Sequence, residues 1–192
     1  MTELICGVDE AGRGPLAGKV YAAAVILNPM MSIKGLTDSK KLSNIKREEL
    51  YEKIIESAYA YSIRSADVAE IEQLNILQAT LLAMKRAVES LSIIPTLVQI
   101  DGNKAPKLAV KTETIVKGDL KVSAISAASI LAKVTRDREM IEIDKIYPEY
   151  GFINHKGYGT KEHLAAIAKF GVLPIHRKGF APIKYLVKDL FS

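Results

Sequence analysis

The chain has 192 residues, of which 48% are hydrophobic, with a formal net charge of +5 and one cysteine. This length suits one globular domain that buries about 70% of its extended-chain surface. No apolar run approaches the ~20 residues that span a bilayer, and no signal-peptide layout is present, so we expect a cytoplasmic protein without a membrane segment. The lone Cys6 excludes an internal disulfide, and its apolar neighbours predict a buried thiol without chemistry.

Hydrophobic periodicity predicts strands that alternate with helices along the chain. The expected strands lie at residues 4–8, 19–27, 59–68, 96–100 and 113–116. The expected helices lie at residues 44–60, 76–91, 123–147 and 160–170, with a loop at 150–159 and a further helix near the C-terminus. Such alternation is typical of α/β proteins. No repeat, low-complexity segment or linker divides the chain, which predicts a single domain over residues 1–192.

Four carboxylates stand at the ends of these predicted strands. Asp9 and Glu10 follow the first strand, and Asp101 and Asp119 follow the last two. A single carboxylate in such a place is most often a turn former or a helix cap. Four together suit Mg²⁺ or Mn²⁺, hard ions that prefer oxygen ligands and that in pairs promote phosphodiester hydrolysis. Lysines cluster in the surrounding segments, and an acidic centre in a basic rim suits a nucleic-acid substrate.

The first two acids run directly into a glycine-rich turn. Adjacent side chains of a strand point to opposite faces, so Asp9 and Glu10 are expected to converge only where the chain leaves strand geometry. Gly12 and Gly14 permit this departure because glycine tolerates positive φ. The turn does not match a dinucleotide-binding loop, because the acids precede the glycines and Pro15 interrupts the pattern.

The expected helix at residues 123–147 carries one polar stripe. Ser126, Ser129, Lys133 and Asp137 recur at spacings of three and four residues, which places them on one face. Two interpretations remain open: contact with a substrate, or packing of small residues on the sheet followed by a surface Asp–Arg network. Asp137 is expected to be structural rather than catalytic.

The three histidines do not form a recognisable catalytic or zinc pattern. His155, His163 and His176 lack metal-ligand spacing with a cysteine, and no serine stands in a nucleophile-elbow motif. We therefore expect loop or helix-capping histidines and disfavour zinc sites and Ser–His catalysis.

Six blocks of sequence, in order along the chain, resemble the motifs of the type 2 ribonucleases H, and specifically of the ribonuclease HII family. They are GVDEAGRGPLAG at 7–18, DSKKL at 38–42, DGN at 101–103, KGD at 117–119, SAASILAKVTRD at 126–137, and HKGYGT at 155–160 with HR at 176–177. Several blocks in register make coincidence an inadequate explanation, and no position that the family uses for chemistry departs from the pattern.

The resemblance implies a fold, an activity and a metal requirement. The fold is an α/β ribonuclease H-like mixed sheet flanked by helices, with a helical C-terminal region that binds substrate. The activity is hydrolysis of the RNA strand of RNA–DNA hybrids and cleavage on the 5′ side of ribonucleotides embedded in duplex DNA, leaving 3′-hydroxyl and 5′-phosphate ends. The family's catalytic acids map onto Asp9, Glu10, Asp101 and Asp119, which are expected to hold two Mn²⁺ or Mg²⁺ ions.

The resemblance also implies residues that bind the substrate. In the family, the loop that matches Gly12, Arg13 and Gly14 contacts the ribonucleotide at an RNA–DNA junction, and Tyr158 is expected to stack beside that junction. The phosphate contacts are expected at three lysines that would otherwise be ordinary solvated side chains. These lysines are Lys40, Lys41 and Lys156.

Two alternatives are weighed against this interpretation. Ribonuclease HIII shares the scaffold but carries an additional N-terminal substrate-binding domain, whereas only eight residues precede Asp9 here. A non-catalytic hybrid-binding module would lack one of the four acids, and all four are present. The expected partners are thus an RNA–DNA hybrid and ribonucleotide-containing duplex DNA, bound by a monomer with no membrane association. Residues 185–192 show no clear pattern for binding a sliding clamp.

Overall fold

The computed structural model describes residues 3–37, 39 and 42–189, and its centre is a mixed five-stranded sheet. The strands are β1 (Ile5–Ala11), β2 (Val20–Ile26), β3 (Ala60–Ala66), β4 (Leu97–Asp101) and β5 (Thr112–Ile115). Their order in the sheet is β3-β2-β1-β4-β5. The β1 strand pairs antiparallel with β2 and parallel with β4, while β2–β3 is antiparallel and β4–β5 is parallel. The carboxyl ends of β1, β4 and β5 therefore meet at one edge of the sheet.

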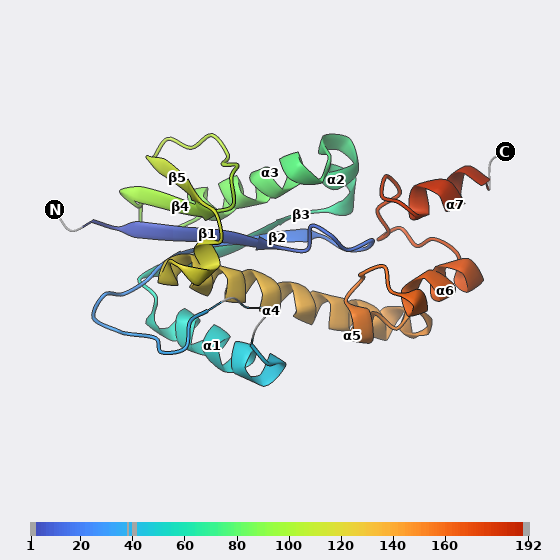
Figure 1. Cartoon of the computed structure of the whole chain (residues 1–192), viewed down its shortest axis with the longest axis horizontal. Coiled ribbons are helices and arrows are strands. Elements are labelled where there is room, and N and C mark those ends of the chain that lie inside the picture. Colours follow the sequence, from blue (N-terminus) through green and yellow to red (C-terminus); the bar gives the residue numbers. More distant parts are fainter. Residues whose placement is uncertain (1–2, 38, 40–41, 190–192) are drawn as a thin grey trace.

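Helices cover both faces of this sheet, and a helical C-terminal region lies beyond one end of it (Figure 1). The longer helices are α1 (Asn44–Ser57), α3 (Ile76–Glu89), α4 (Ser123–Ile146) and α6 (Lys161–Phe170). The shorter ones are α2 (Val68–Leu74), η2 (Gly118–Leu120), η3 (Pro148–Tyr150), α5 (Phe152–His155) and α7 (Ile183–Asp189). In Figure 1, α2 and α3 lie on one side of the sheet, and α4 with α1 on the other.

Alternation along the strands divides the core between the two faces. In β1, Cys6 and Val8 face an apolar cluster that includes α2 and α3, whereas Gly7 faces α4. A Cβ at Gly7 would lie 2.1 Å from the main-chain carbon of Ala124, so only glycine lets the first turn of α4 pack this closely on β1. Cys6 is buried as expected, and burial raises the pKa of its thiol to about 12.

The C-terminal region packs on the outer half of α4 and on the turn between β1 and β2. Leu16 and Ala17 from this turn join Met140 of α4 and Tyr150 and Phe152 from the C-terminal region in a third apolar cluster. Tyr150 and Phe152 stack with ring centroids 5.5 Å apart. This cluster fixes the glycine-rich turn between the sheet and the C-terminal helices.

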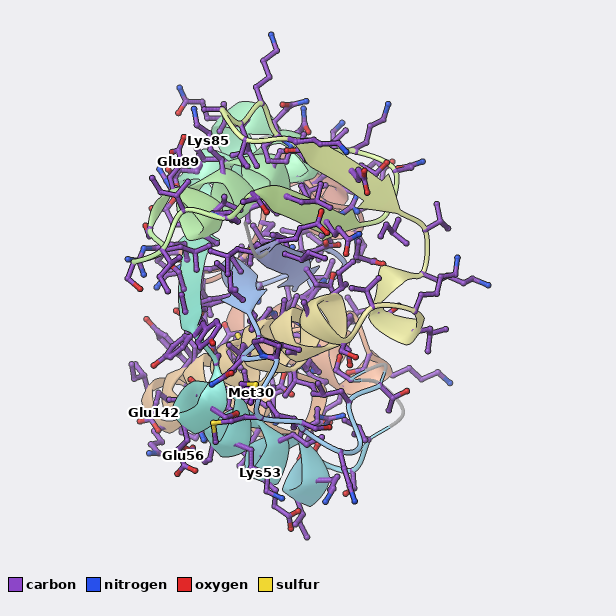
Figure 2. The ribbon with its side chains drawn as sticks, turned by 90° about the vertical axis from the view of Figure 1, so that its left-hand side faces the viewer. Met30, Lys53, Glu56, Lys85, Glu89 and Glu142 are labelled. Atoms are coloured by element: carbon purple, nitrogen blue, oxygen red, sulfur yellow. The ribbon has the colours of Figure 1, made fainter. Side chains whose placement is uncertain are left out.

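The outer faces of the helices carry mixed charges. Figure 2 shows Lys85 and Glu89 projecting outward from α3, and Lys53 and Glu56 projecting from α1. The Lys85 ammonium lies 3.7 Å from the Glu89 carboxylate, an exposed i, i+4 pair. Such pairs contribute only about 0.5 kcal/mol each, so the fold depends mainly on the two apolar layers against the sheet.

The predicted α/β class and mixed sheet are confirmed, as are all five strands and the longer helices within a few residues. Two short elements depart from the prediction. The helix α2 follows β3 directly, beginning with a capping box between Asp67 and Glu70, and its seven residues give too little periodicity to be recognised. The loop expected at 150–159 is wrong in its middle, where Gly151 with a φ of 68° starts the single turn of α5. The expectation of one domain over residues 1–192 stays a prediction.

Candidate active site

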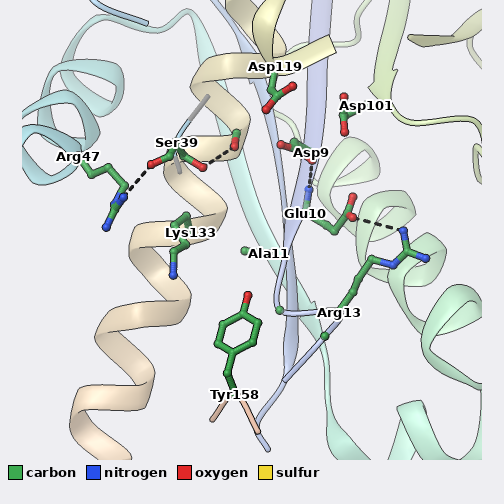
Figure 3. A pocket seen from close by; sticks show the side chains of 13 residues that line it. Asp9, Glu10, Ala11, Arg13, Ser39, Arg47, Asp101, Asp119, Lys133 and Tyr158 are labelled. Carbon is green, nitrogen blue, oxygen red and sulfur yellow. Dashed lines mark hydrogen bonds and ion pairs between the residues drawn. The ribbon is translucent and has the colours of Figure 1, made fainter. Parts of the chain in front are cut away.

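The candidate site lies where the parallel strands β1 and β4 end. Val8 and Ile100 are the last residues that pair β1 with β4, so Asp9, Glu10 and Asp101 stand beyond the pairing of these two strands. A pocket of about 510 Å³ opens here. Ligands of open α/β sheets commonly bind outside the carboxyl ends of strands. The side chains that line this pocket come from segments far apart in the sequence (Figure 3).

Asp9 is the most buried acid of the site, with 6% of its surface exposed. One of its oxygens, Oδ1, accepts a hydrogen bond of 2.7 Å from the main-chain amide of Glu10. Burial raises the pKa of the Asp9 carboxyl well above its usual range, and the negative charges of Glu10 and Asp101 raise it further. The amide of Glu10 and the hydroxyl of Ser129 oppose this shift by stabilising the charged form. Asp9 therefore stands in a site crowded with like charge.

Glu10 reaches the same pocket from the opposite side of the strand. The expected departure from strand geometry is wrong, because β1 continues to Ala11 and Glu10 stays paired with Ala22. Both acids line the pocket, which opens where β4 stops pairing with β1 and leaves this edge of β1 uncovered. The Glu10 carboxylate lies 3.5 Å from the guanidinium of Arg13, an ion pair visible in Figure 3.

Asp101 and Asp119 reach the pocket from the other two strands. Asp101 is the last residue of β4, and its Oδ1 accepts a 2.6 Å hydrogen bond from the amide of Gly118. Asp119 does not end a strand as expected, since it lies in η2, four residues beyond the last paired position, Ile115 of β5. Figure 3 shows the carboxylates of Asp119, Asp9 and Asp101 pointing into one region of the pocket. The four acids predicted from the sequence are therefore brought together.

This donor set fits divalent cations in its chemistry. Four carboxylates supply only hard oxygen ligands, and their mutual repulsion around the buried Asp9 is what a nearby cation would relieve. In the described part of the chain, no three His, Cys, Asp or Glu side chains already stand close enough to hold one ion. The carboxylates thus have the composition of a magnesium or manganese site.

The opposite wall of the pocket is basic and hydroxylic, and the sequence identified only part of it. Lys133 and Ser129 line the pocket from α4, which favours the substrate-contact interpretation for this part of the polar stripe. The Lys133 ammonium pairs with Asp137 at 2.6 Å, so Asp137 contacts a lysine and not an arginine as one interpretation expected. Burial lowers the pKa of Lys133. Ser39 and Arg47 complete this wall without having been predicted.

The third wall is the turn between β1 and β2 together with Tyr158. Gly12, Arg13 and Gly14 line the pocket, and Tyr158 stands beside them with 44% of its surface exposed. Positive φ is required at Gly12 (96°) but not at Gly14, so the sequence was right about only one of the two glycines. A Cβ at Gly14 would meet the Tyr158 ring at an ordinary 3.6 Å.

The three lysines predicted to contact phosphate are not all placed in this pocket. Lys40 and Lys41 lie outside the described residues. Lys156 is half-buried next to the Tyr158 segment, does not line the pocket, and donates from its ammonium to the carbonyl of Ile153. Its role in binding stays a prediction.

The histidines lie in a loop or near helix ends as expected, but they form a buried stack behind Tyr158. His163 and His176 have no exposed surface, and their Nε2 atoms are 3.0 Å apart. His155 stacks on His163 with ring centroids 4.4 Å apart. The Nδ1 of His163 donates to the carbonyl of Tyr158, so the stack connects the C-terminal region to the residue that flanks the pocket. Burial lowers the pKa of both His163 and His176 to about 4.

Two buried arginines are the largest features that the sequence analysis missed. Arg136 and Arg177 have 1% and 0% of their surface exposed. Both donate to main-chain carbonyls of the segment that carries the pocket glycines. His176 and Arg177, which resemble a substrate-facing family segment, therefore lie behind the pocket wall rather than on its surface. No periodicity or spacing distinguishes these arginines from solvated ones.

Comparison with known proteins identifies the family. A family model described as Ribonuclease HII matches residues 6–183. A protein named Ribonuclease HII from Coxiella burnetii (strain RSA 493 / Nine Mile phase I) is 65% identical over 183 residues, which are 95% of this chain and 91% of that protein. The Ribonuclease HII of Burkholderia pseudomallei (strain 1710b) is 60% identical over 182 residues, covering 95% and 85%. The chain belongs to the ribonuclease HII family.

Solved structures agree with this assignment. The ribonuclease H2 of Pyrococcus horikoshii superposes with a TM-score of 0.81 at 27% identity and covers 98% of this chain and 99% of that one. The ribonuclease HII of Archaeoglobus fulgidus, solved in complex with PCNA, gives 0.70 at 23% identity, covering 92% and 95%. A ribonuclease HIII solved with Mn²⁺ gives 0.72 at 15% identity, covering 97% and 70%. The last two likenesses concern the fold alone.

Membership of the ribonuclease HII family makes the chain a ribonuclease H, a hydrolase that cuts RNA paired with DNA. The family expectation drawn from the six sequence blocks is confirmed, and the ribonuclease HIII and non-catalytic alternatives are not supported. Ribonucleases H use divalent metal ions, in agreement with the donor set at the end of the sheet. Among the described residues, none of the helices combines the length and the apolar character needed to cross a bilayer.

Proposed function

We propose that this member of the ribonuclease HII family hydrolyses the RNA strand of RNA–DNA hybrids and also cuts duplex DNA on the 5′ side of an embedded ribonucleotide. The catalytic residues are Asp9, Glu10, Asp101 and Asp119, which hold two Mg²⁺ or Mn²⁺ ions during the reaction. One observation carries this proposal: four carboxylates from three parallel strands and their following turn line one pocket, opposite a wall of cationic and hydroxyl groups.

Cleavage on the 5′ side of a ribonucleotide breaks the bond between its phosphorus and the O3′ of the preceding nucleotide. Water adds its oxygen to phosphorus and a proton reaches the leaving O3′, so the products end in a 3′-hydroxyl and a 5′-phosphate. Divalent ions held by the four acids would make the attacking water more acidic and would neutralise charge on the phosphate oxygens. The chain contributes position: the amides of Glu10 and Gly118 each fix one oxygen of an acid and thereby orient the other oxygen toward the pocket.

The remaining walls of the pocket hold the substrate. Lys133 and Arg47 stand opposite the acids and provide positive charge for phosphates near the cut. Arg13 and the glycines beside it approach the sugar, where a 2′-hydroxyl distinguishes RNA from DNA. The exposed ring of Tyr158 stacks on the sugar or base at the junction. Lys40, Lys41 and Lys156 are proposed as further phosphate contacts outside the pocket.

The chain is proposed to work as a cytoplasmic monomer and as a single domain over residues 1–192, in which the helical C-terminal segment forms part of the substrate surface. The third apolar cluster supports this unity, because Leu16 and Ala17 of the pocket turn share it with Tyr150 and Phe152. No sliding-clamp contact is proposed.

Gel electrophoresis of the cleavage products tests the proposed function. The substrates are a DNA duplex with one ribonucleotide, a continuous RNA–DNA hybrid and an all-deoxy duplex, each assayed with Mg²⁺, with Mn²⁺ and with a chelator. We expect metal-dependent cuts in the first two and none in the third, and the nick in the ribonucleotide duplex should carry 3′-hydroxyl and 5′-phosphate ends that a ligase rejoins. Cleavage of the hybrid alone would refute the ribonucleotide-specific part, and cleavage in the chelator would refute the metal assignment.

A further inference from the structure

Arg177 is fully buried behind the turn that carries the pocket glycines. Its guanidinium makes six hydrogen bonds of 2.6–3.2 Å, using the Nε and both terminal nitrogens. The acceptors are the main-chain carbonyls of Gly12, Arg13, Pro15, Gly18 and Lys19. One side chain from residue 177 therefore gathers five carbonyls of a segment that lies more than 150 positions earlier in the sequence.

Arg136 of α4 supports the same segment from a second direction. Its guanidinium donates to the carbonyls of Ala17 and Lys19 at 3.2 and 3.4 Å, and to that of Lys156 at 2.9 Å. Every hydrogen-bond acceptor of the two arginines among the described residues is a main-chain carbonyl. The two cations are thus surrounded by carbonyl dipoles, an arrangement that fixes peptide orientation as well as position.

The orientation of these carbonyls determines where the amides of the turn point. In a trans peptide, the C=O of one residue and the N–H of the next point in opposite directions, and the peptides of this turn are all trans. Because the carbonyls of Gly12 and Arg13 point at Arg177, the amides of Arg13 and Gly14 point away from it. Neither amide has a hydrogen-bond partner among the described residues.

We infer that Arg177 is a positioning residue for ribonucleotide recognition. By drawing the carbonyls inward, it presents the amides of Arg13 and Gly14 as donors to a sugar hydroxyl or phosphate oxygen of the bound ribonucleotide. Its positive charge, which no carboxylate of the described residues neutralises by direct contact, lies behind the same peptides and favours an anionic ligand on their outer side. The inference rests on the proposed function, because it deepens the role of the turn in that reaction.

Substitution by lysine separates the effect of the guanidinium fork from that of charge. Arg177→Lys keeps a cation but cannot hold five carbonyls, so we expect kcat/KM at a single ribonucleotide to fall by about a hundredfold. The loss on a continuous RNA–DNA hybrid should be smaller, because many phosphate contacts position that substrate. The matched control is Arg138→Lys on the exposed face of α4, where the guanidinium pairs with Glu48 and Glu52. This control should leave both rates unchanged.

A second variant and a measurement on the unmodified enzyme keep the test independent of folding. Arg177→Ala leaves a cavity, and millimolar guanidinium should restore its activity where tetramethylammonium at equal ionic strength does not. In the unmodified enzyme, NMR should show the amides of Arg13 and Gly14 protected from exchange by a single-ribonucleotide duplex and not by the all-deoxy duplex, which has the same phosphates and lacks the hydroxyl. Equal protection by both duplexes would assign the amides to phosphate.

Two results would overturn the inference. One is a folded Arg177→Lys enzyme whose preference between the two substrates is unchanged, and the other is the absence of protection at both amides in an enzyme that cleaves the ribonucleotide duplex. An unmodified enzyme that cleaves neither substrate would instead refute the proposed function, so the two failures are distinguishable.

Discussion

The acidic wall and the glycine-rich wall of the pocket treat buried charge in opposite ways. On the acidic wall, Asp9 is almost fully buried and lies near the like charges of Glu10 and Asp101. On the glycine-rich wall, the buried cations Arg136 and Arg177 are surrounded by carbonyl oxygens. Burial of a charge is costly unless hydrogen bonds compensate for it. The buried charges behind the glycine-rich wall are compensated by hydrogen bonds within the chain. The charges of the acidic wall gain further compensation when an external cation binds.

This difference distinguishes residues that take part in the reaction from residues that position the main chain. A group of repelling carboxylates lowers the stability of the protein and is retained where function needs it. A guanidinium that satisfies several carbonyls adds rigidity to the main chain around it. We therefore expect substitutions on the acidic wall to affect activity without loss of fold, and substitutions behind the glycine-rich wall to affect both.

The largest effect is expected for Asp101→Asn. The amide oxygen of asparagine still accepts the hydrogen bond from Gly118, and one negative charge is removed beside Asp9, so the protein should stay folded or become slightly more stable. Cleavage should fall by about a thousandfold or more, because a metal ligand is lost. Steady-state cleavage and thermal unfolding measure the two effects.

The control is Asp67→Asn, which exchanges a helix cap for an equally good one far from the pocket and should change neither quantity appreciably. Asp137→Asn should reduce activity or stability in part, because it breaks only the pair with Lys133. A folded Asp101→Asn enzyme with near-normal turnover would contradict the assignment of the acids as metal ligands.

Acid should destabilise the region behind the glycine-rich wall. His163 and His176 are held neutral, with a pKa of about 4 in the folded protein against an ordinary 6.5. Above pH 6.5 the histidines are neutral in both states, and their full contribution is present. Between pH 6.5 and 4 the unfolded chain takes up protons that the folded chain does not, so stability is lost by up to about 3 kcal/mol per histidine.

This pH dependence has a structural cause that NMR can check. The Nδ1–H of His163 donates to Tyr158, so its Nε2 must accept from His176, whose Nδ1 accepts from the amide of Leu173. Protonation of His163 or His176 disrupts this arrangement of donors and acceptors. His155 and Glu162 are the other titratable groups close to His163. Denaturation at several pH values and the titration of the imidazole protons measure the effect. Imidazoles that titrate near pH 6.5 in the folded protein would contradict it.

The two glycines of the turn should differ sharply. A Cβ at Gly12 would lie 2.3 Å from the Nε of Arg136, and the φ of 96° is unfavourable for alanine. Gly12→Ala should therefore lower the free energy of unfolding by about 2 kcal/mol or more, a fall in Tm of about 4–8 °C. Gly14→Ala has space and an ordinary φ, so it serves as the matched control for folding. Any loss of ribonucleotide cleavage in Gly14→Ala then reports obstruction of the substrate. Equal Tm values for the two variants would contradict this difference.

Most of the fold and the four acids of the pocket could be predicted from local sequence patterns. The contacts that support the glycine-rich wall could not. The strands carry clear apolar periodicity, and the acids follow them within the range that periodicity resolves. Arg177 acquires its role from Gly12, 165 positions away in the sequence. Such contacts depend on how the C-terminal region packs on α4. The sequence itself does not distinguish a buried arginine from a solvated one. The same reason explains why the histidine stack was expected to be ordinary loop and capping residues.

The smallest effect is expected at Tyr158, the exposed aromatic residue of the glycine-rich wall. Its ring faces solvent, while its main chain is held by His155 and His163. Tyr158→Ala should therefore leave the fold intact and remove about 1–3 kcal/mol of stacking. The loss should be larger for a single ribonucleotide in DNA than for a continuous hybrid, where neighbouring contacts compensate. Tyr158→Phe keeps the ring and should retain most of the activity on both substrates. Cleavage rates of both variants on both substrates provide the measurement, and an equal proportional loss for Tyr158→Ala would reject a junction-specific role.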